Sequence, residues 1–314
     1  MLEKTDNFEL FYDVLDNSIR LLYLIRHDNF FNLLIQSGKN IIACDVLDDE
    51  CPDNVRKKLI ENYERLENVN FNVEEIRKAF QMMSLRAFKE TNLKMGEVTP
   101  DTLGIFFSYL INKLKGKKEK ISLLDPVVGT GNLLYSVANC LDFDLKLYGI
   151  DNVKEVLEIA NVLGNLLNYD IEMFNQDTLL HPFNDMDFVI GDFPDYTFDN
   201  KYFPFAAILT HIDSLKEDGY LIGLFPNDFF THDTDNKFKE ELKNKGSVLG
   251  VLQLPETMFK DNPKSIIIFT KKQLPSKKCL LINLPSFNDY NALNKALVEI
   301  EMWFDNNLEI EGEN

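Results

Sequence analysis

A short apolar run that ends in a glycine turn constrains this chain more than any other stretch. Segment 122–137 reads SLLDPVVGTGNLLYSV: the run leads to Asp125-Pro126, glycines follow at 129 and 131, and apolar residues then recur at helical spacing. Glycine permits a sharp bend and lets a ligand approach backbone N–H groups, which the start of the following helix also offers. The segment predicts a strand, a tight turn and a helix, with a ligand at the turn. A plain strand-to-helix turn is the alternative, because a single G-x-G is a weak motif.

The chain from residue 121 onward alternates between strand and helix patterns. Strands are expected at 121–125, 145–150, 171–174, 188–190 and 220–225, the last after a turn at Asp218-Gly219. This order is typical of βαβ units with parallel strands. Only ten residues separate the strand patterns at 248–254 and 265–270, too few for a parallel crossover, so we expect an antiparallel hairpin. The sequence therefore predicts an α/β, Rossmann-like fold with a mostly parallel seven-stranded sheet that ends in this hairpin.

The first part of the chain has a helical pattern. Apolar residues recur at three- and four-residue spacing in 8–23 and 30–37, and Gly38 is expected to end the second helix. Further helices are expected after Pro52 and over 73–91. No site residue is identified here, since the Met and Phe positions fit a helical core.

The expected domains follow from these patterns. We predict an N-terminal helical domain over 1–95, a sheet domain over 96–273 and a C-terminal strand and helix extension over 274–314. At the start of the sheet domain, Thr99 or Asp101 is expected to cap a helix that has Pro100 in its first turn.

Carboxylates follow the predicted strands. Asp125, Asp151, Asp177 and Asp192 stand at or just past the carboxyl ends of four successive strands. Ligands bind at that edge of open α/β sheets, so we expect the four side chains to share a ligand site, although a single Asp there can equally be a helix cap or a solvated turn residue.

The spacing between the glycine turn and the residues that follow it narrows the choice of ligand. Asp151 lies twenty residues past Gly131, where an acidic residue accepts ribose hydroxyls in nucleotide-binding βαβ units. Leu134 stands where a dinucleotide motif needs a third glycine, and no Gly-Lys-Ser/Thr of a P-loop follows. An adenosine-bearing cofactor without a pyrophosphate remains.

The charge balance bears on partners. With 51 acidic and 33 basic residues the net charge is −18, which opposes binding to the DNA polyanion. The densest basic run, over 113–120, is expected to be a solvated connection.

Other classes of site and location are disfavoured. The four cysteines and four histidines are scattered, without the spacing of a zinc site or a disulfide framework, so no metal is expected. No apolar run reaches the ~20 residues that span a bilayer, and the N-terminus does not read as a signal peptide. We therefore expect a cytoplasmic protein with no membrane partner.

The glycine turn also carries a family resemblance. Its sequence DPVVGTG resembles the D-P-x-x-G-T-G cofactor motif of N6-adenine DNA methyltransferases. The chain is similar to the modification subunit of type I restriction-modification systems and to its small stand-alone bacterial relatives. Segments 96–100, 219–230 and 252–259 resemble further parts of that family in the same order.

The resemblance implies a class I methyltransferase fold with S-adenosylmethionine as cofactor. By it, segment 96–100 closes over the methionine part, Gly129 and Gly131 border that part, Asp151 binds the ribose hydroxyls and Asp177 the adenine amino group. The implied cofactor-binding set is Thr99, Pro100, Asp125, Pro126, Gly129, Thr130, Gly131, Asn132, Asp151, Asn152, Asp177 and Thr178.

The family's catalytic motif, Asn/Asp-Pro-Pro-Tyr/Phe, corresponds to DFPDY at 192–196. By the resemblance, Asp192, the Phe193 carbonyl and Pro194 belong to the catalytic site and orient an amino nitrogen for the methyl group. Phe193 replaces the first proline, and Asp195 stands where the aromatic residue belongs. Tyr196, one position later, is the candidate for stacking on a base turned out of the duplex.

The implied activity is methylation of adenine N6 in DNA. Two alternatives stay open: a cofactor-binding or interaction protein with impaired catalysis, and an N-methyltransferase acting on a protein amide or a small molecule. Because only residues 274–314 follow the sheet domain, target recognition is expected to need a protein partner.

Overall fold

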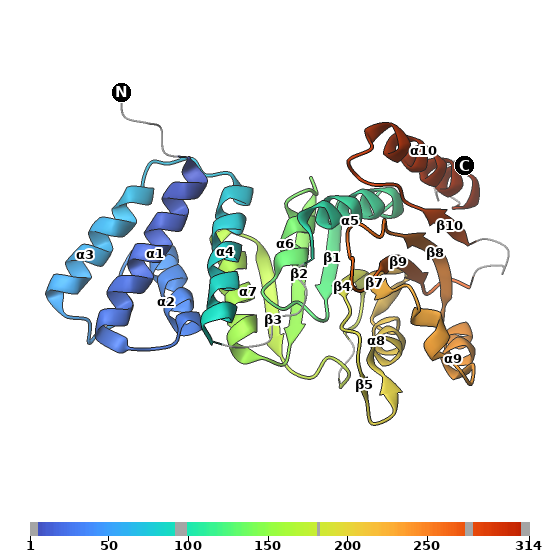
Figure 1. Ribbon diagram of the computed structural model, residues 1–314, viewed down its shortest axis with the longest axis horizontal. Coiled ribbons are helices and arrows are strands. Elements are labelled where there is room, and N and C mark those ends of the chain that lie inside the picture. The colour runs from blue at the N-terminus through green and yellow to red at the C-terminus, as the bar shows by residue number, and fades with distance from the viewer. Residues whose placement is uncertain (1–5, 92–98, 181–182, 274–278, 309–314) are drawn as a thin grey trace.

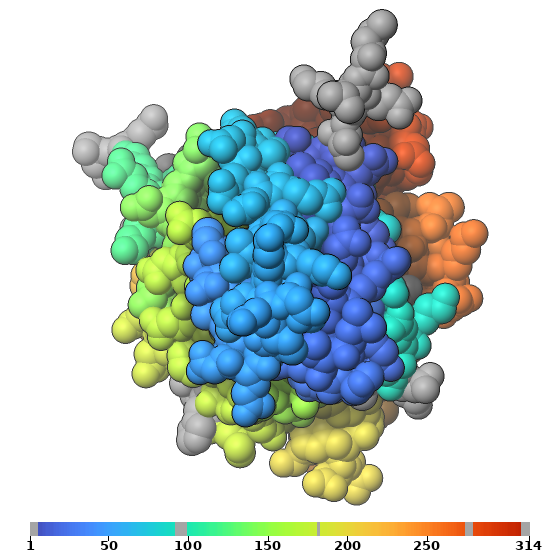
Figure 2. Space-filling model, turned by 90° about the vertical axis from the view of Figure 1, so that its left-hand side faces the viewer, coloured from blue at the N-terminus to red at the C-terminus, as the bar shows by residue number. Residues whose placement is uncertain are grey.

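The N-terminal part of the chain folds into four packed helices. The structure is a computed structural model that describes residues 6–91, 99–180, 183–273 and 279–308. In Figure 1 the helices form one end of an elongated molecule, and in Figure 2 α1 and α3 form the outer surface of that end. Their bounds are α1 Asn7–Arg26, α2 Phe30–Ala43, α3 Asp53–Tyr63 and α4 Val73–Thr91, with the 3-10 turn η1 Glu64–Leu66 after α3.

Gly38 lies inside α2, so the expectation that it ends this helix is wrong. A Cβ atom at Gly38 would lie 2.3 Å from Cγ1 of Val162 in α7 (Lys154–Leu166). The glycine is therefore explained by close packing of the helical domain on the sheet domain. Helix α2 ends instead at Cys44, which has a left-handed backbone.

An eight-stranded sheet forms the centre of the molecule. Its strand order is β10-β8-β9-β7-β4-β1-β2-β3. The bounds are β1 Lys120–Asp125, β2 Asp144–Asp151, β3 Asp170–Asn175, β4 Met186–Asp192, β7 Leu215–Pro226, β8 Ser247–Gln253, β9 Lys264–Thr270 and β10 Leu280–Asn283. The neighbouring strands β7, β4, β1, β2 and β3 are parallel to one another. Strand β9 is antiparallel to both β7 and β8. The predicted hairpin is confirmed, and β10, which pairs with β8 in parallel, adds one strand to the seven expected.

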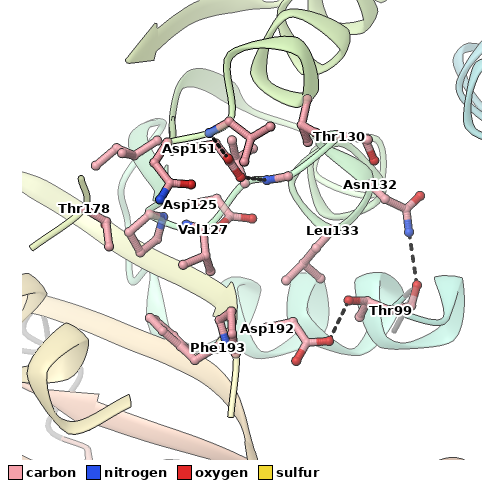
Figure 3. A pocket seen from close by; sticks show the side chains of 18 of the residues that line it. Thr99, Asp125, Val127, Thr130, Asn132, Leu133, Asp151, Thr178, Asp192 and Phe193 are labelled. Carbon is pink, nitrogen blue, oxygen red and sulfur yellow. Dashed lines mark hydrogen bonds between the residues drawn. The ribbon is translucent and has the colours of Figure 1, made fainter. Parts of the chain in front are cut away.

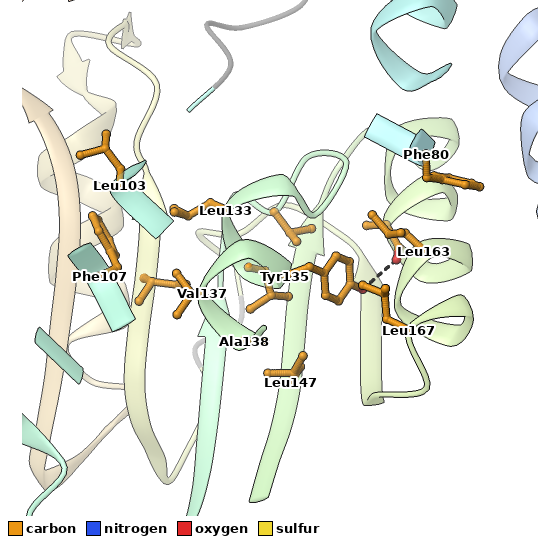
Figure 4. Close-up of a cluster of buried hydrophobic side chains, with 14 of the residues drawn as sticks. Phe80, Leu103, Phe107, Leu133, Tyr135, Val137, Ala138, Leu147, Leu163 and Leu167 are labelled. Atoms are coloured by element: carbon orange, nitrogen blue, oxygen red, sulfur yellow. Dashed lines mark hydrogen bonds between the residues drawn. The ribbon is translucent and has the colours of Figure 1, made fainter. Parts of the chain in front are cut away.

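Helices cover both faces of this sheet. Helices α5 (Asp101–Leu114), α6 (Asn132–Ala138) and α7 pack on the face that also meets the helical domain, as Figure 4 shows with Leu103, Tyr135 and Leu163 in one buried cluster. Helices α8 (Phe203–His211) and α9 (Lys237–Lys245) cover the other face. The remaining elements are the small hairpin of β5 (Thr197–Phe198) and β6 (Lys201–Tyr202), η2 Phe229–His232 and α10 Tyr290–Asn307.

Two local expectations are corrected. Asp218-Gly219 is not a turn but part of β7. Met186 of β4 pairs with Leu215 of β7, and Phe188 pairs with Tyr220, so the register shifts between these two pairs. The residues of β7 between Leu215 and Tyr220 therefore form an irregular start of the strand. Pro100 holds the N-cap position of α5, so neither Thr99 nor Asp101 is its cap.

The predicted domain boundary near residue 95 lies outside the described residues, so this boundary stays a prediction. Residues 96–98 of the segment 96–100 also lie outside the described residues. In the part of the chain that the structure describes, no helix combines the length and apolar character needed to cross a membrane.

Candidate functional site

A cavity of about 860 Å³ opens at the carboxyl ends of the central strands. Loops that follow β1, β2, β3 and β4 form it, and all four predicted carboxylates, Asp125, Asp151, Asp177 and Asp192, line it. Figure 3 shows Asp125, Asp151 and Asp192 around its centre. The size falls within the range of cofactor sites, and the position is the one expected for an open α/β sheet.

The two glycines of the turn have different roles. Gly129 (φ 54°) and Gly131 (φ 82°) both have left-handed backbones. A Cβ atom at Gly129 would meet open space, and its N–H donates to Asp151 Oδ2 at 3.1 Å, so the backbone here faces the cavity. A Cβ atom at Gly131 would lie 2.4 Å from the Tyr135 ring, so this glycine is needed for packing against α6.

Burial raises the pKa of two carboxyl groups in the cavity. Asp125 is 2% exposed and accepts a hydrogen bond from Val127 N at 3.0 Å. Its burial raises its pKa to about 8, and the charges of Asp151 and Asp192 add to the shift. Burial also raises the pKa of Asp151, although this carboxylate accepts from Val153 N at 2.8 Å as well as from Gly129 N.

The third strand end contributes a more open edge. Asp177 is exposed and accepts from Leu179 N at 2.9 Å. Thr178 is buried, and its hydroxyl shares a 2.8 Å hydrogen bond with Nε2 of His211. Burial lowers the pKa of His211 to about 4, so this ring is neutral and holds Thr178 in place.

Helix α4 of the helical domain forms one wall of the cavity. The sequence pattern did not predict this role for α4. Its lining residues are Gln81, Ser84, Leu85 and Phe88. Their spacing of three and four residues is the signal that a second face of this helix is in use.

A buried arginine links α4 to the start of α6. Arg77, with no exposed surface, donates to Asn132 Oδ1 at 2.6 Å and pairs with Glu74 and Asp101. Asn132 in turn donates through Nδ2 to the Thr99 carbonyl at 3.0 Å (Figure 3). Both ends of the Asn132 amide are thereby oriented at the cavity.

Both oxygens of Asp192 already have donors. Thr99 Oγ1 donates to Oδ2 at 2.9 Å, and Lys264 Nζ donates to Oδ1 at 2.8 Å. Lys264, which also lines the cavity, was missed in the sequence analysis. The available signal was a lone lysine opening the buried strand KSIIIFT of β9.

Packing holds the backbone of the DFPDY segment. The Phe193 ring is buried and stacks on Phe225, with centroids 5.0 Å apart and planes 7° apart. Phe193 N also donates to Leu224 O at 3.3 Å. The neighbouring Gly191 and Gly223 leave room for the ring, since a Cβ atom at either would lie within about 3 Å of it.

An aromatic side chain still borders the cavity. Tyr196 is half exposed, lines the cavity and stacks on Phe203 with centroids 4.7 Å apart. Asp195 accepts a 3.0 Å hydrogen bond from the Tyr202 hydroxyl, whose pKa is raised by burial and by this carboxylate. Asp195 is thus tied to the β5–β6 hairpin.

The cavity brings together most of the residues predicted for the site. Pro100 and Gly131, both described, are not part of its lining. The predicted residues that do line it are Thr99, Asp125, Pro126, Gly129, Thr130, Asn132, Asp151, Asn152, Asp177, Thr178, Asp192, Phe193, Pro194 and Tyr196.

Two family patterns match the sequence. The YtxK N-terminal helical domain matches residues 9–88, and the N-6 DNA methylase pattern matches residues 81–303. The uncharacterized protein YtxK of Bacillus subtilis (strain 168) is 34% identical over 274 residues, which cover 80% of this chain and 83% of that protein.

Solved structures are similar along most of the chain. A Listeria monocytogenes protein assigned to the class I S-adenosylmethionine-dependent methyltransferases is 30% identical, with a TM-score of 0.83 over 95% of this chain and 99% of its own. The methyltransferase subunit of a type I restriction-modification system from Streptococcus thermophilus is 15% identical, with a TM-score of 0.59 over 94% of this chain and 74% of its own. A type I modification subunit from Vibrio vulnificus is 13% identical, with a TM-score of 0.56 over 80% of this chain and 62% of its own, so these two show a shared fold.

Proposed function

Since this chain belongs to the N-6 DNA methylase family of S-adenosylmethionine-dependent methyltransferases, we propose that it methylates an amino nitrogen, with adenine N6 in DNA as the acceptor. The class I methyltransferase fold that the family resemblance implies is confirmed. The observation that carries the proposal is the position of Asp192, Phe193 and Tyr196 in the same cavity as the Gly129 turn.

The residues around the glycine turn fit S-adenosylmethionine. The open space at Gly129 is a cradle that a Cβ atom would fill, and it suits the methionine part. We assign Asp151 to bind the ribose hydroxyls of the cofactor, and the exposed Asp177 to bind its adenine amino group. The cofactor supplies an electrophilic methyl group on a sulfonium, a cationic centre that suits a cavity lined by carboxylates.

The proposed role of the acceptor-binding residues follows from the weak nucleophilicity of an aromatic amine. Its nitrogen lone pair is delocalised into the ring, so it is a weak nucleophile. Asp192 and the Phe193 carbonyl would each accept a hydrogen bond from one of its two N–H groups. These hydrogen bonds would localise the lone pair toward the methyl group. Stacking of Phe193 on Phe225 supports a fixed carbonyl here without the ring of a proline, and Tyr196 supplies a face for the base.

One observation favours a second function. Asp192 already accepts from Lys264 and Thr99, so an acceptor amine has to compete for its oxygens. In this second proposal, the protein is a cofactor-binding or interaction protein in which methyl transfer is impaired.

The charge of the cavity favours a different acceptor for the same chemistry. Asp151, Asp177, Asp192 and Asp195 all line it and would repel phosphates. A protein amide or a small amine is therefore the acceptor to test beside DNA.

The test separates binding from transfer. Calorimetry with S-adenosylmethionine is expected to show one site, which is absent in Asp151→Ala. Radiolabelled methyl transfer is then measured to unmethylated adenine-containing DNA, to protein extract and to small amines, each with and without cell extract that can provide a recognition partner. Label in DNA N6-methyladenine supports the first proposal, binding without label in any acceptor supports the second, and absence of binding refutes both.

A further inference from the structure

A chain of hydrogen bonds joins the helical domain to the acceptor end of the cavity. Arg77 of α4 donates to Asn132 Oδ1 at 2.6 Å, and Asn132 Nδ2 donates to the Thr99 carbonyl at 3.0 Å. Thr99 Oγ1 then donates to Asp192 Oδ2 at 2.9 Å. Figure 3 shows the last two of these bonds, with Thr99 between Asn132 and Asp192. Three hydrogen bonds therefore lead from α4 to the carboxylate that is assigned to the acceptor nitrogen.

The position of Arg77 is fixed by its other partners. Its side chain has no exposed surface, and all three guanidinium nitrogens have acceptors. Besides Asn132, these are Glu74 at 2.7 and 2.8 Å, Gln81 at 3.3 Å and Asp101 at 3.1 Å. A buried guanidinium needs such a set, because each unpaired N–H would cost free energy. A shift of Arg77 would break several bonds at once, so this side chain is a well-defined starting point of the chain.

Arg77 holds Thr99 from two directions. Its partner Asp101, in the first turn of α5, lies two residues after Thr99, and its partner Asn132 bonds the Thr99 carbonyl itself. Pro100 stands between Thr99 and Asp101, and its ring restricts the backbone of this short segment. Arg77, which the structure describes, is not part of the lining of the cavity. Its effect on the acceptor end therefore passes through these neighbours.

The direction of Asp192 decides whether it can orient an amine. A carboxylate without donors can rotate about its side-chain bonds, and a misplacement of about 1 Å can reduce a rate about a hundredfold. Each carboxylate oxygen has two lone-pair sites, so Oδ2 can accept from Thr99 and from a substrate N–H. The Thr99 hydroxyl therefore orients Asp192 and leaves a site on Oδ2 for the acceptor.

We propose that Arg77 is a positioning residue for Asp192, which acts from the helical domain through Asn132 and Thr99. The proposal rests on the function proposed above, because that function assigns Asp192 to the acceptor nitrogen. Its consequence is that the sheet domain needs α4 to orient its acceptor site. The N-terminal helical domain is then part of the catalytic unit.

The experiment compares the wild type with Arg77→Lys, Thr99→Val and their double variant. Lysine keeps the positive charge beside Glu74 and Asp101 but has a single nitrogen, so it cannot also hold Asn132. Valine keeps the shape of threonine without its hydroxyl. Hydrogen exchange of the backbone amides in 192–196 is measured on the ligand-free proteins. Each single variant is expected to exchange about tenfold faster or more in this segment.

The double variant shows whether the two residues act through one chain. Two breaks in one chain have the effect of one, so it is expected to exchange within about threefold of the faster single variant. Methyl transfer is measured with the acceptor that the wild type labels. In Arg77→Lys, kcat should fall about tenfold or more, while the Kd of S-adenosylmethionine stays within about threefold of the wild type.

Two variants serve as controls. Ser18 is buried in the helical domain, is hydrogen-bonded to Ser37 and Tyr63, and has no part in the chain. Ser18→Ala is therefore expected to destabilise the same domain without faster exchange in 192–196. Thr99→Ser keeps the hydroxyl and should retain exchange and kcat close to the wild type.

Wild-type exchange in 192–196 of Arg77→Lys, or an unchanged kcat, would overturn the role of Arg77. Additive effects of the two substitutions would do so too. If Arg77→Lys does not fold, Asn132→Asp takes its place, because an aspartate still pairs with Arg77 but repels the Thr99 carbonyl. Absence of methyl transfer in the wild type would instead refute the proposed function, and the exchange measurement would still decide whether Arg77 positions the Asp192 segment.

Discussion

Gly129 and Gly131 provide a prediction in which stability and binding separate. Both have left-handed backbones, in which an alanine costs about 1–2 kcal/mol relative to glycine. At Gly129 nothing else lies within 4 Å of the added Cβ atom, so Gly129→Ala is expected to cost only this amount. The methyl group enters the cavity, however, and should weaken S-adenosylmethionine binding tenfold or more.

Gly131→Ala is expected to show the opposite pattern. Its Cβ atom would lie 2.4 Å from the Tyr135 ring, which has little room to move because its hydroxyl donates to Ala160 O at 2.7 Å. Overpacking of this kind adds about 1–3 kcal/mol, for a total of about 2–5 kcal/mol. Since Gly131 does not line the cavity, the folded fraction should bind the cofactor within about threefold of the wild type.

Thermal unfolding and calorimetry check both variants. About 2–4 °C per kcal/mol is typical of large domains, so the midpoint should fall by about 2–8 °C in Gly129→Ala and further in Gly131→Ala. Gly116→Ala is the matched control, because Gly116 also has a positive φ and open space and is not among the cavity residues. The reasoning is refuted if Gly131→Ala loses cofactor binding while Gly129→Ala keeps it, or if the two lose equal stability.

Three further predictions test other parts of the site. Arg77→Met should lower the free energy of unfolding by about 2–3 kcal/mol in urea titrations, somewhat less than for a fully buried pair because its carboxylate partners are partly exposed; no loss would contradict the role of Arg77 as a link. The raised pKa of Asp125 favours folding at low pH, and this contribution is lost as pH rises from about 4 to about 8, so the stability of Asp125→Asn relative to the wild type should increase between pH 5 and pH 8. A difference that stays constant over that range would argue against it. Tyr196→Ala should reduce methyl transfer to adenine in DNA about tenfold or more while S-adenosylmethionine affinity stays unchanged, because a stacked base contributes about 1–3 kcal/mol; equal rates would remove Tyr196 from the acceptor site.

The parts of the fold that depend on local pattern could be predicted from the sequence. The strand, glycine turn and helix at 120–138 form as expected, because the two positive-φ glycines and the following apolar spacing dictate them locally. The four carboxylates meet because the carboxyl ends of parallel strands meet at one edge, and strand alternation was enough to predict parallel strands.

The parts that depend on distant contacts could not. Thr99 reads as a helix cap, but its hydroxyl bonds to Asp192, 93 residues away in sequence. Lys264 pairs with the same carboxylate across 72 residues. Gly38 reads as a helix end because glycine disfavours helices, whereas close packing on Val162 explains it in the structure. In each case the local preference was overridden by a partner that spacing does not reveal.

Helix α4 belongs to two structures at once. Phe88 packs edge-on against Phe31 in the interior of the helical domain and also lines the cavity. A ligand that binds only the folded cavity stabilises whatever unfolds together with it, by RT ln(1 + [L]/Kd). Occupancy of the cavity and cooperative unfolding of the N-terminal helices are therefore thermodynamically linked, and hydrogen exchange of the α4 amides should slow as the cavity fills. The opening equilibrium of the helices at the end of the molecule therefore depends on the ligand bound at the sheet.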